Sequence, residues 1–190
     1  MINNIERTIK KGTSRSGLAY FYCDVSDSRK RNVTDILRSL VVNLLVWQPV
    51  NESILNAVYQ DCGGGYSKPS NEALYKVLRQ FISTFQQAYI LIDALDESLD
   101  REKMVELVET IHGWDLEQCH LLVTSRKEQW IVESMVSTKP MEVDMTQMPV
   151  DADIEKYIDS HLCSSLELRR WSSDEKVFIK HVILKKAKGM

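Results

Sequence analysis

The sequence predicts an α/β fold, in which helices cover a parallel β-sheet, followed by a short helical segment. Short apolar runs alternate with amphipathic helical stretches between residues 18 and 145, which is typical of a parallel sheet with helical crossovers. Two of these runs are apolar on both faces, as buried strands must be. After residue 148 the pattern becomes purely helical, so we expect an α/β body over residues 1–148 and a helical part over residues 149–190.

Four apolar runs are predicted to be strands: residues 18–23, 88–93, 120–124 and 141–145. The last run has the weakest apolar pattern. The second and third are apolar on both faces and are therefore expected at the centre of the sheet.

Apolar residues that recur every three or four positions predict the helices. These cover residues 33–45, a stretch after Pro49, and residues 70–85, 104–111, 151–162 and 172–188. Asn32 and Ser70 are expected to cap the helices that follow them, and Ser172 and Glu175 have the spacing of a capping box. Gly63–Gly65 breaks the helix after Pro49, and a flexible loop is expected there.

The composition fits one compact domain and excludes several classes of protein. The chain has 190 residues, of which 44% are hydrophobic, with only 7 Gly and 4 Pro, so disordered and low-complexity architectures are excluded. With a net charge of -3 and a pI near 5.8, the chain lacks the electrostatic footprint of a nucleic-acid binder, so nucleic acid is not an expected partner. No apolar run approaches the roughly 18 residues of a membrane span. We expect a cytoplasmic protein without a membrane partner, whose four cysteines are reduced structural thiols.

Three carboxylates lie at or just after the end of the strand predicted at residues 88–93. Asp93 ends this strand, and Asp96 and Glu97 come within four residues of it. Ligands of open α/β sheets bind at the carboxyl ends of the strands, and crowded carboxylates favour a bound cation such as Mg²⁺. Alternatively, Asp96 and Glu97 only cap the next helix and interact with its dipole.

The next predicted strand ends in Thr124-Ser125-Arg126, at the same edge of the sheet. An arginine beside an acidic strand end suits a metal–phosphate group, because its guanidinium donates several hydrogen bonds to phosphate oxygens. The alternative is an ion pair of Arg126 with Asp93 or Asp96 that only ties two loops together.

Three segments in this order resemble one known family: Leu-Ala-Tyr-Phe-Tyr-Cys-Asp at residues 18–24, Ile-Leu-Ile-Asp-Ala-Leu-Asp-Glu at 90–97 and Leu-Leu-Val-Thr-Ser-Arg at 121–126. The chain resembles the NACHT-type NTPase domain of the nephrocystin-like N-terminal group, found in many fungal ankyrin- and WD-repeat proteins. The resemblance implies a three-layer sheet of the P-loop NTPase type. It also implies signalling by switching between an ADP-bound closed state and an ATP-bound oligomer.

The resemblance also implies roles for the residues at the sheet edge. Asp93 matches the Walker B acid that holds Mg²⁺, Asp96 and Glu97 match the catalytic acids that position or activate water, and Arg126 matches the sensor of the terminal phosphate. The resemblance implies ATP or ADP with Mg²⁺ as the cofactors of the full-length parent. The sequence does not distinguish ATP from GTP. Its other parts would be C-terminal ankyrin or WD repeats and an upstream effector domain.

The phosphate loop of the family, G-x-x-x-x-G-K-S/T, does not occur in this sequence. The segments Gly12–Gly17 and Gly63–Lys68 lack the required Gly-Lys-Ser/Thr and are interpreted as a linker and an inter-helix loop. We therefore expect a fragment that lacks the first strand, with no cofactor of its own and no NTPase activity alone. Without that strand, either the runs 120–124 and 141–145 pair directly, or an open edge leaves the chain marginally stable.

Two other functions stay open. The first is a degenerate protein-interaction scaffold that uses the same sheet without nucleotide. The second is a phosphoacceptor receiver domain, because Asp24, Asp93 and Thr124 also fall at strand ends. The receiver hypothesis is disfavoured, because it needs a lysine after the final strand and Asp144-Met145-Thr146 supplies none.

Overall fold

The computed structural model describes residues 2–11, 15–24, 32–47, 52–98, 100–138, 140–144, 150–165 and 167–187. The chain divides into two compact units, residues 1–140 and 141–190, and each is described by itself. The boundary expected near residue 148 falls among residues 145–149, outside the described residues. In the described part, no helix is long and apolar enough to cross a membrane.

The first unit contains a three-stranded parallel sheet, as the sequence predicts. Its strands are β1 (Ser16–Tyr22), β2 (Gln87–Asp93) and β3 (Cys119–Val123), in the order β1-β2-β3. The register aligns Tyr22 with Asp93, and Ile92 with Val123, so the carboxyl ends of the strands lie at one edge.

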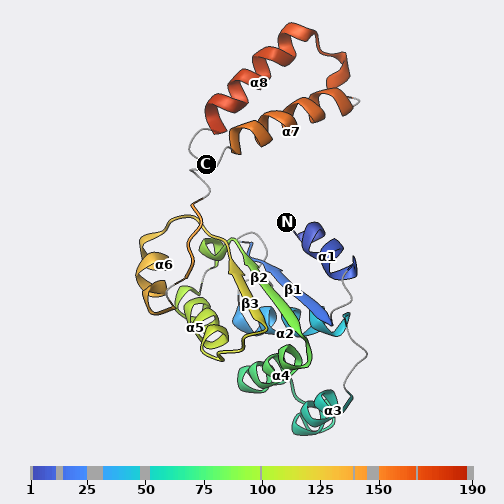
Figure 1. Cartoon of the computed structure of the whole chain (residues 1–190), viewed down its shortest axis with the longest axis vertical. Coiled ribbons are helices and arrows are strands. Elements are labelled where there is room, and N and C mark those ends of the chain that lie inside the picture. Colours follow the sequence, from blue (N-terminus) through green and yellow to red (C-terminus); the bar gives the residue numbers. More distant parts are fainter. Residues whose placement is uncertain are drawn as a thin grey trace. The chain divides into compact units, whose positions relative to one another are not determined.

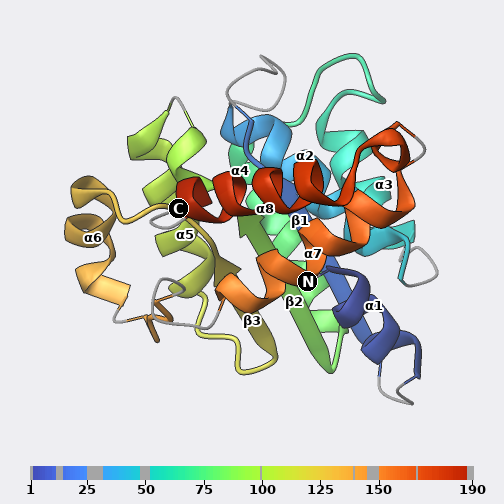
Figure 2. The same ribbon diagram turned by 90° about the horizontal axis from the view of Figure 1, so that it is seen from above.

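Helices flank this sheet unevenly, more on one face than on the other. The helices of the first unit are α1 (Ile2–Lys11), α2 (Val33–Leu45), α3 (Glu52–Asp61), α4 (Asn71–Thr84), α5 (Arg101–His112) and α6 (Gln129–Ser134). Short 3₁₀ turns lie at η2 (Leu95–Glu97) and η3 (Met135–Thr138). Both views place α6 on the β3 side of the strands and α1 on the β1 side (Figure 1, Figure 2).

Two of the predicted caps are present in this unit. The side chain of Asn32 accepts a hydrogen bond from the Asp35 N–H at 2.8 Å, and that of Ser70 accepts one from the Ala73 N–H at 3.2 Å. Each of these side chains accepts a hydrogen bond from a backbone N–H that has no acceptor inside the helix. These caps fix the residues at which α2 and α4 begin.

One face of the sheet packs against α2, α4 and α5 and forms the main core. Alternate strand residues point to this face, and Ala19, Ile90 and Ile92 are fully buried in it. The helices contribute apolar stripes to the same core, such as Leu37 and Leu40 of α2. Each fully buried Leu or Ile stabilises the fold by about 1.5–3 kcal/mol relative to an exposed position.

The opposite face of the sheet is only partly covered by the described residues. Helix α1 packs against β1, and the indole N–H of Trp47 donates to the Leu18 carbonyl at 2.9 Å. Leu18 and Leu91 are buried here, whereas Tyr22 is 47% exposed. This face therefore holds a smaller second core toward β1, with Tyr22 exposed at the carboxyl end of that strand.

The prediction that residues 120–124 form a central strand is wrong within the described residues. There β3 pairs only with β2 and is an edge strand, and Leu122 is 43% exposed. The fourth predicted strand is also wrong, because residues 141–144 have no regular structure and Met145 lies outside the described residues. An apolar pattern indicates that a strand can be buried, but it does not predict whether a second strand pairs with it on each side. The sequence analysis expects either direct pairing of the runs 120–124 and 141–145 or an open sheet edge. Within the described residues β3 has an open edge, and the marginal stability of the chain stays a prediction.

Of the two glycine-containing segments, the predicted linker differs in part from expectation, whereas the predicted inter-helix loop is present. Residues 12–14 of the predicted linker lie outside the described residues, whereas Ser16 and Gly17 already belong to β1. The Gly63–Gly65 segment joins α3 and α4, and all three glycines have positive φ, between 64° and 91°. It is a turn held by backbone hydrogen bonds, with Gly63 N–H donating to Gln60 at 2.8 Å and Gly64 N–H to Tyr59 at 2.9 Å.

The second unit is a pair of helices joined by a short 3₁₀ turn: α7 (Val150–Ser164), η5 (Leu168–Arg170) and α8 (Ser173–Ala187). The predicted capping box opens α8, because the Ser172 N–H donates to Glu175 Oε2 at 2.7 Å and the Glu175 N–H donates to Ser172 Oγ at 3.3 Å. Lys180 joins the two helices by ion pairs of 2.8 Å with Glu155 and with Asp159. Lys188, the predicted helix end, lies outside the described residues.

Gly17 provides a test of this packing. A Cβ atom there would lie 2.6 and 2.7 Å from two ring atoms of Phe85, which is only 4% exposed and cannot move away freely. Gly17→Ala should therefore lower the free energy of unfolding in urea by about 1–3 kcal/mol. In a Phe85→Leu background the same substitution should cost clearly less, and an equal cost in both backgrounds would contradict this packing.

Candidate functional site

The four predicted site residues lie at the carboxyl edge of the sheet. Asp93 is the last residue of β2, Asp96 and Glu97 lie in η2 directly after it, and Arg126 follows β3 by three residues. Because β2 and β3 are parallel neighbours, their ends meet at one edge. The structure thus brings the predicted residues to one place.

A hydrogen-bonded bridge through Thr124 holds the end of β2 against the end of β3. The Thr124 hydroxyl donates to Asp93 Oδ1 and accepts the Ala94 N–H at 3.0 Å. The backbone carbonyl of Thr124 accepts the Leu95 N–H at 2.9 Å, and its N–H donates to the Ile92 carbonyl at 2.9 Å. Because the oxygen of the Thr124 hydroxyl accepts the Ala94 N–H, the hydroxyl proton points to Asp93. This hydrogen bond fixes the orientation of the Asp93 carboxylate.

The backbone turns sharply within this bridge. Ala94 has φ 55° and ψ 51°, in the left-handed region that costs a non-glycine residue about 1–2 kcal/mol. This conformation places the amides of Ala94 and Leu95 toward Thr124, so the hydrogen bonds of the bridge offset the backbone strain.

Asp96 is the second link between the two strand ends. Its side chain is only 10% exposed, and Oδ1 accepts the backbone N–H of Arg126 at 3.0 Å. The Arg126 guanidinium Nε lies 3.6 Å from Asp96 Oδ2, with the arginine side chain 79% exposed. An exposed ion pair stabilises little, so the charge-assisted bond to the backbone amide is the stronger of the two contacts.

The ion pair that the sequence left open as an alternative is therefore present between Arg126 and Asp96. It does not include Asp93, whose side chain contacts Thr124 instead.

The acidic groups also act on the neighbouring strand β1. Burial, and then the carboxylates of Asp93, Glu97 and Asp96, raise the pKa of the Cys23 thiol to about 11. Tyr22 pairs in register with Asp93, and burial and that carboxylate raise the pKa of its phenol. The Cys23 N–H donates to the Asp93 carbonyl at 3.0 Å, so the end of β1 is tied to the same edge. Burial and these carboxylates therefore disfavour the thiolate form of Cys23.

The carboxylates do not form a complete metal site by themselves. Across the described ranges, no three His, Cys, Asp or Glu side chains are grouped closely enough to hold a metal ion. Asp93 keeps one carboxylate oxygen, Oδ2, that takes no hydrogen bond from any described residue. An oxygen donor of this kind suits Mg²⁺, which in nucleotide sites is bound by one or two carboxylates together with phosphates and waters.

The sequence predicts Thr124 only as a residue at the end of a strand, which the disfavoured receiver hypothesis also uses, and not as the link between the ends of β2 and β3. The usable signal was its position, since Thr124 directly follows β3 just as Asp93 ends the adjacent strand β2.

Comparison with known proteins identifies the family. The family described as "Nephrocystin 3, N-terminal" matches residues 1–126, which include the three strands and the four candidate residues. The chain belongs to this family. The match confirms the resemblance to the NACHT-type, nephrocystin-like N-terminal group.

One curated relative is the vegetative incompatibility protein HET-E-1 of Podospora anserina. It is 31% identical over 133 residues, which cover 66% of this chain and 9% of that protein. The chain thus spans about 9% of the length of this relative. No solved structure shows a significant match to the chain.

The bridge predicts a difference between two substitutions at Thr124. Thr124→Val removes the hydroxyl that serves both Asp93 and Ala94, and should lower the free energy of unfolding by about 1–3 kcal/mol. Thr124→Ser keeps the hydroxyl and loses one methyl group, so it should cost no more than about 1 kcal/mol. Urea unfolding of both variants measures the difference. Equal losses would mean that the hydroxyl does not hold the two strand ends together.

Proposed function

We propose that this chain is part of a NACHT-type NTPase that acts as a nucleotide-dependent signalling switch, and that its carboxyl sheet edge is one half of the nucleotide site. The observation that carries the proposal is the meeting of Asp93, Asp96, Glu97 and Arg126 at that edge in a member of the nephrocystin 3 N-terminal family. Acidic groups beside an arginine provide ligands for both parts of a metal–phosphate group.

In this proposal Asp93 would hold the Mg²⁺ ion, because Thr124 occupies only one of its two carboxylate oxygens. Mg²⁺ would supply neutralisation of the phosphate charge. Glu97 has no hydrogen-bond or ion-pair partner within the described part of the chain, so its carboxylate is available to position water. Asp96 would take part in the same step only after releasing Arg126.

Arg126 would bind the terminal phosphate of the nucleotide. Its guanidinium is 79% exposed and is attached to Asp96 by a contact of 3.6 Å, which a phosphate could replace. A doubly charged phosphate attracts a guanidinium more strongly than a single carboxylate does. Exchange of Arg126 between Asp96 and the nucleotide would then couple the nucleotide state to the loop after β3.

The other half of the site would come from a phosphate loop. Most of the affinity of such a site comes from backbone N–H groups and a lysine around the phosphates, and these 190 residues contain no Gly-x-x-x-x-Gly-Lys-Ser/Thr. We therefore propose that the chain alone neither binds nor hydrolyses ATP appreciably. A longer cytoplasmic parent would carry that loop together with C-terminal WD or ankyrin repeats and an effector domain.

A protein-interaction scaffold without nucleotide is the second candidate. The Asp96–Arg126 ion pair favours it, because that contact already gives both residues a structural role.

Calorimetry with Mg-ATP separates the two functions. The 190-residue chain should show no binding at micromolar nucleotide, whereas a longer product of the same locus that includes a phosphate loop should bind. In that longer protein Asp93→Asn should abolish hydrolysis, with a loss of at least about 100-fold in kcat, because the Mg²⁺ ligand is lost.

Asp174→Asn is the matched control, since Asp174 is exposed on α8 and carries the same charge. It should leave turnover unchanged. Micromolar binding by the short chain, or normal turnover in the Asp93 variant, would refute the assignment.

A further inference from the structure

The second unit carries an exposed serine that closely follows a pair of arginines. The residues before α8 are Arg169-Arg170-Trp171-Ser172, so the two arginines stand three and two residues before the hydroxyl. Arg170 and Ser172 are exposed, and Trp171 is 42% exposed. The Arg170 side chain forms no hydrogen bond or ion pair with any described residue. The cap of α8 therefore uses Ser172 but not the arginine before it.

The Ser172 hydroxyl is held only by contacts at the surface. It donates to Glu175 Oε2 at 2.9 Å and accepts the Glu175 N–H at 3.3 Å, and Glu175 is itself exposed. Trp171 has extended backbone, with φ -81° and ψ 141°, and Ser172 lies outside both η5 and α8. An enzyme can therefore reach this hydroxyl by detaching a surface cap, without opening a core.

Arginines at these positions suit recognition by a protein kinase. A guanidinium donates several hydrogen bonds to carboxylates, so acidic pockets of a kinase can bind both arginines. Charge patterns around the hydroxyl decide which substrates a kinase accepts. We propose that Ser172 is a phosphorylation site of an arginine-directed serine/threonine kinase. The inference concerns the second unit and does not depend on the proposed function.

The kinase would supply ATP as the phosphate donor. Ser172 Oγ forms a bond to the γ-phosphorus of ATP, and the bond from that phosphorus to the leaving ADP breaks. The hydroxyl proton passes to the catalytic aspartate of the kinase.

The structure disfavours a second hydroxyl that also has arginines before it. Arg29 and Arg31 stand five and three residues before Thr34. Thr34, however, lies within the first turn of α2 and is half-buried, and its hydroxyl donates to Asn71 Oδ1 at 2.7 Å. A kinase would have to unwind the start of α2 to reach it, so Thr34 is not an expected substrate.

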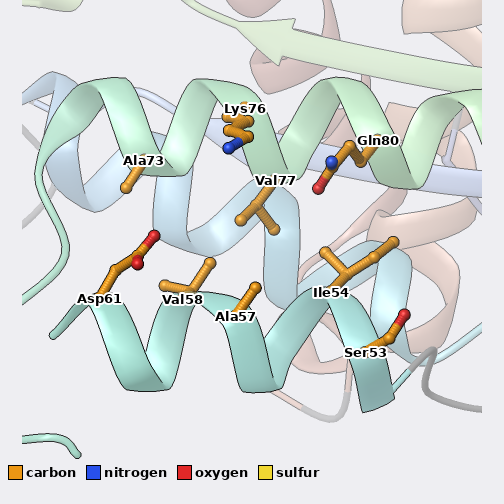
Figure 3. Close-up of a pocket in the computed structure, with 9 residues that line it drawn as sticks. All are labelled: Ser53, Ile54, Ala57, Val58, Asp61, Ala73, Lys76, Val77 and Gln80. Atoms are coloured by element: carbon orange, nitrogen blue, oxygen red, sulfur yellow. The ribbon is translucent and has the colours of Figure 1, made fainter. Parts of the chain in front are cut away.

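Exposure alone does not distinguish Ser172. Ser53 is also exposed, in the first turn of α3, where it lines the end of a groove between α3 and α4 (Figure 3). None of the ten residues before Ser53 is an arginine or a lysine. The arginine pair is therefore the feature that selects Ser172.

A phosphate would change the cap to which it is attached. Ser172 Oγ would lose the proton that it donates to Glu175, and would gain a charge of about -1.5 to -2 beside that carboxylate. In the unmodified chain the hydrogen bonds from Ser172 lower the pKa of Glu175, so phosphorylation should raise this pKa. The phosphate itself is favoured by the free N–H groups at the start of α8. It would replace Glu175 in the cap.

Phosphorylation of the purified chain tests the site. The 190-residue chain is incubated with ATP and the catalytic subunit of cyclic-AMP-dependent kinase, an arginine-directed enzyme, and mass spectrometry locates the phosphate. We expect one phosphate, on Ser172. Arg170→Gln should lower kcat/KM for the chain by at least about tenfold, because the kinase loses a charge-assisted contact. Ser172→Ala should take up no phosphate.

Ser173→Ala is the matched control, because Ser173 is the neighbouring exposed serine and should not be needed. Circular dichroism confirms that each variant is folded. The proposal is overturned if no phosphate is incorporated, if it lies on Thr34 or another residue, or if Arg170→Gln is modified as fast as the unmodified chain. An NMR titration of the Glu175 carboxyl checks the effect on the cap, and an unchanged pKa after phosphorylation would contradict the replacement of Glu175.

Discussion

The hydrogen-bonded bridge between the ends of β2 and β3 is the constraint on which the candidate site depends. A parallel strand pair brings two chain ends to one edge but leaves the following residues free to diverge. Here the Thr124 hydroxyl, its carbonyl and the Asp96 carboxylate bind Asp93, Ala94, Leu95 and Arg126. The bridge keeps an acidic segment and an arginine close together although about thirty residues separate them in sequence.

The bridge is possible because both strands are fixed from one side. The main core under the sheet is made of fully buried residues of β2, α2 and α4, such as Ile90, Leu37 and Leu78. The opposite face is less complete, and β3 is an edge within the described residues. The well-packed face therefore positions the site.

Much of the first unit could be predicted from the sequence, because local physics decides it. Strands β1 and β2 contain continuous apolar runs, and the caps at Asn32 and Ser70 use side chains that favour helix starts wherever they occur. The apolar run of β3 predicts a central strand, because such a run does not reveal whether a neighbouring strand exists, and the open edge is expected only as one of two outcomes of the missing phosphate-loop strand. The prediction of a strand at residues 141–145 is wrong for the same reason, since a strand needs a partner strand that the local sequence pattern does not provide.

The sequence predicts which residues lie at the candidate site, but not most of the hydrogen bonds between them. Residues at successive strand ends gave Asp93, Asp96, Glu97 and Arg126, since parallel strands end at one edge. The ion pair of Arg126 with Asp96 is one of the two partners that the sequence leaves open for this arginine. The central place of Thr124 depends on the left-handed turn at Ala94, which no residue pattern indicates because alanine rarely adopts this conformation. The roles of these residues toward Mg²⁺ and nucleotide stay predictions.

Native-state hydrogen exchange of individual amides, followed by NMR, tests the bridge most directly. The amides of Ala94, Leu95 and Arg126 all donate to groups within it. If the bridge holds the two strand ends together, these amides should exchange only through global unfolding, with the same free energy as core amides of β2. Exchange as fast as that of the exposed Lys68 would show that the two strand ends separate in the native state, and would contradict the account.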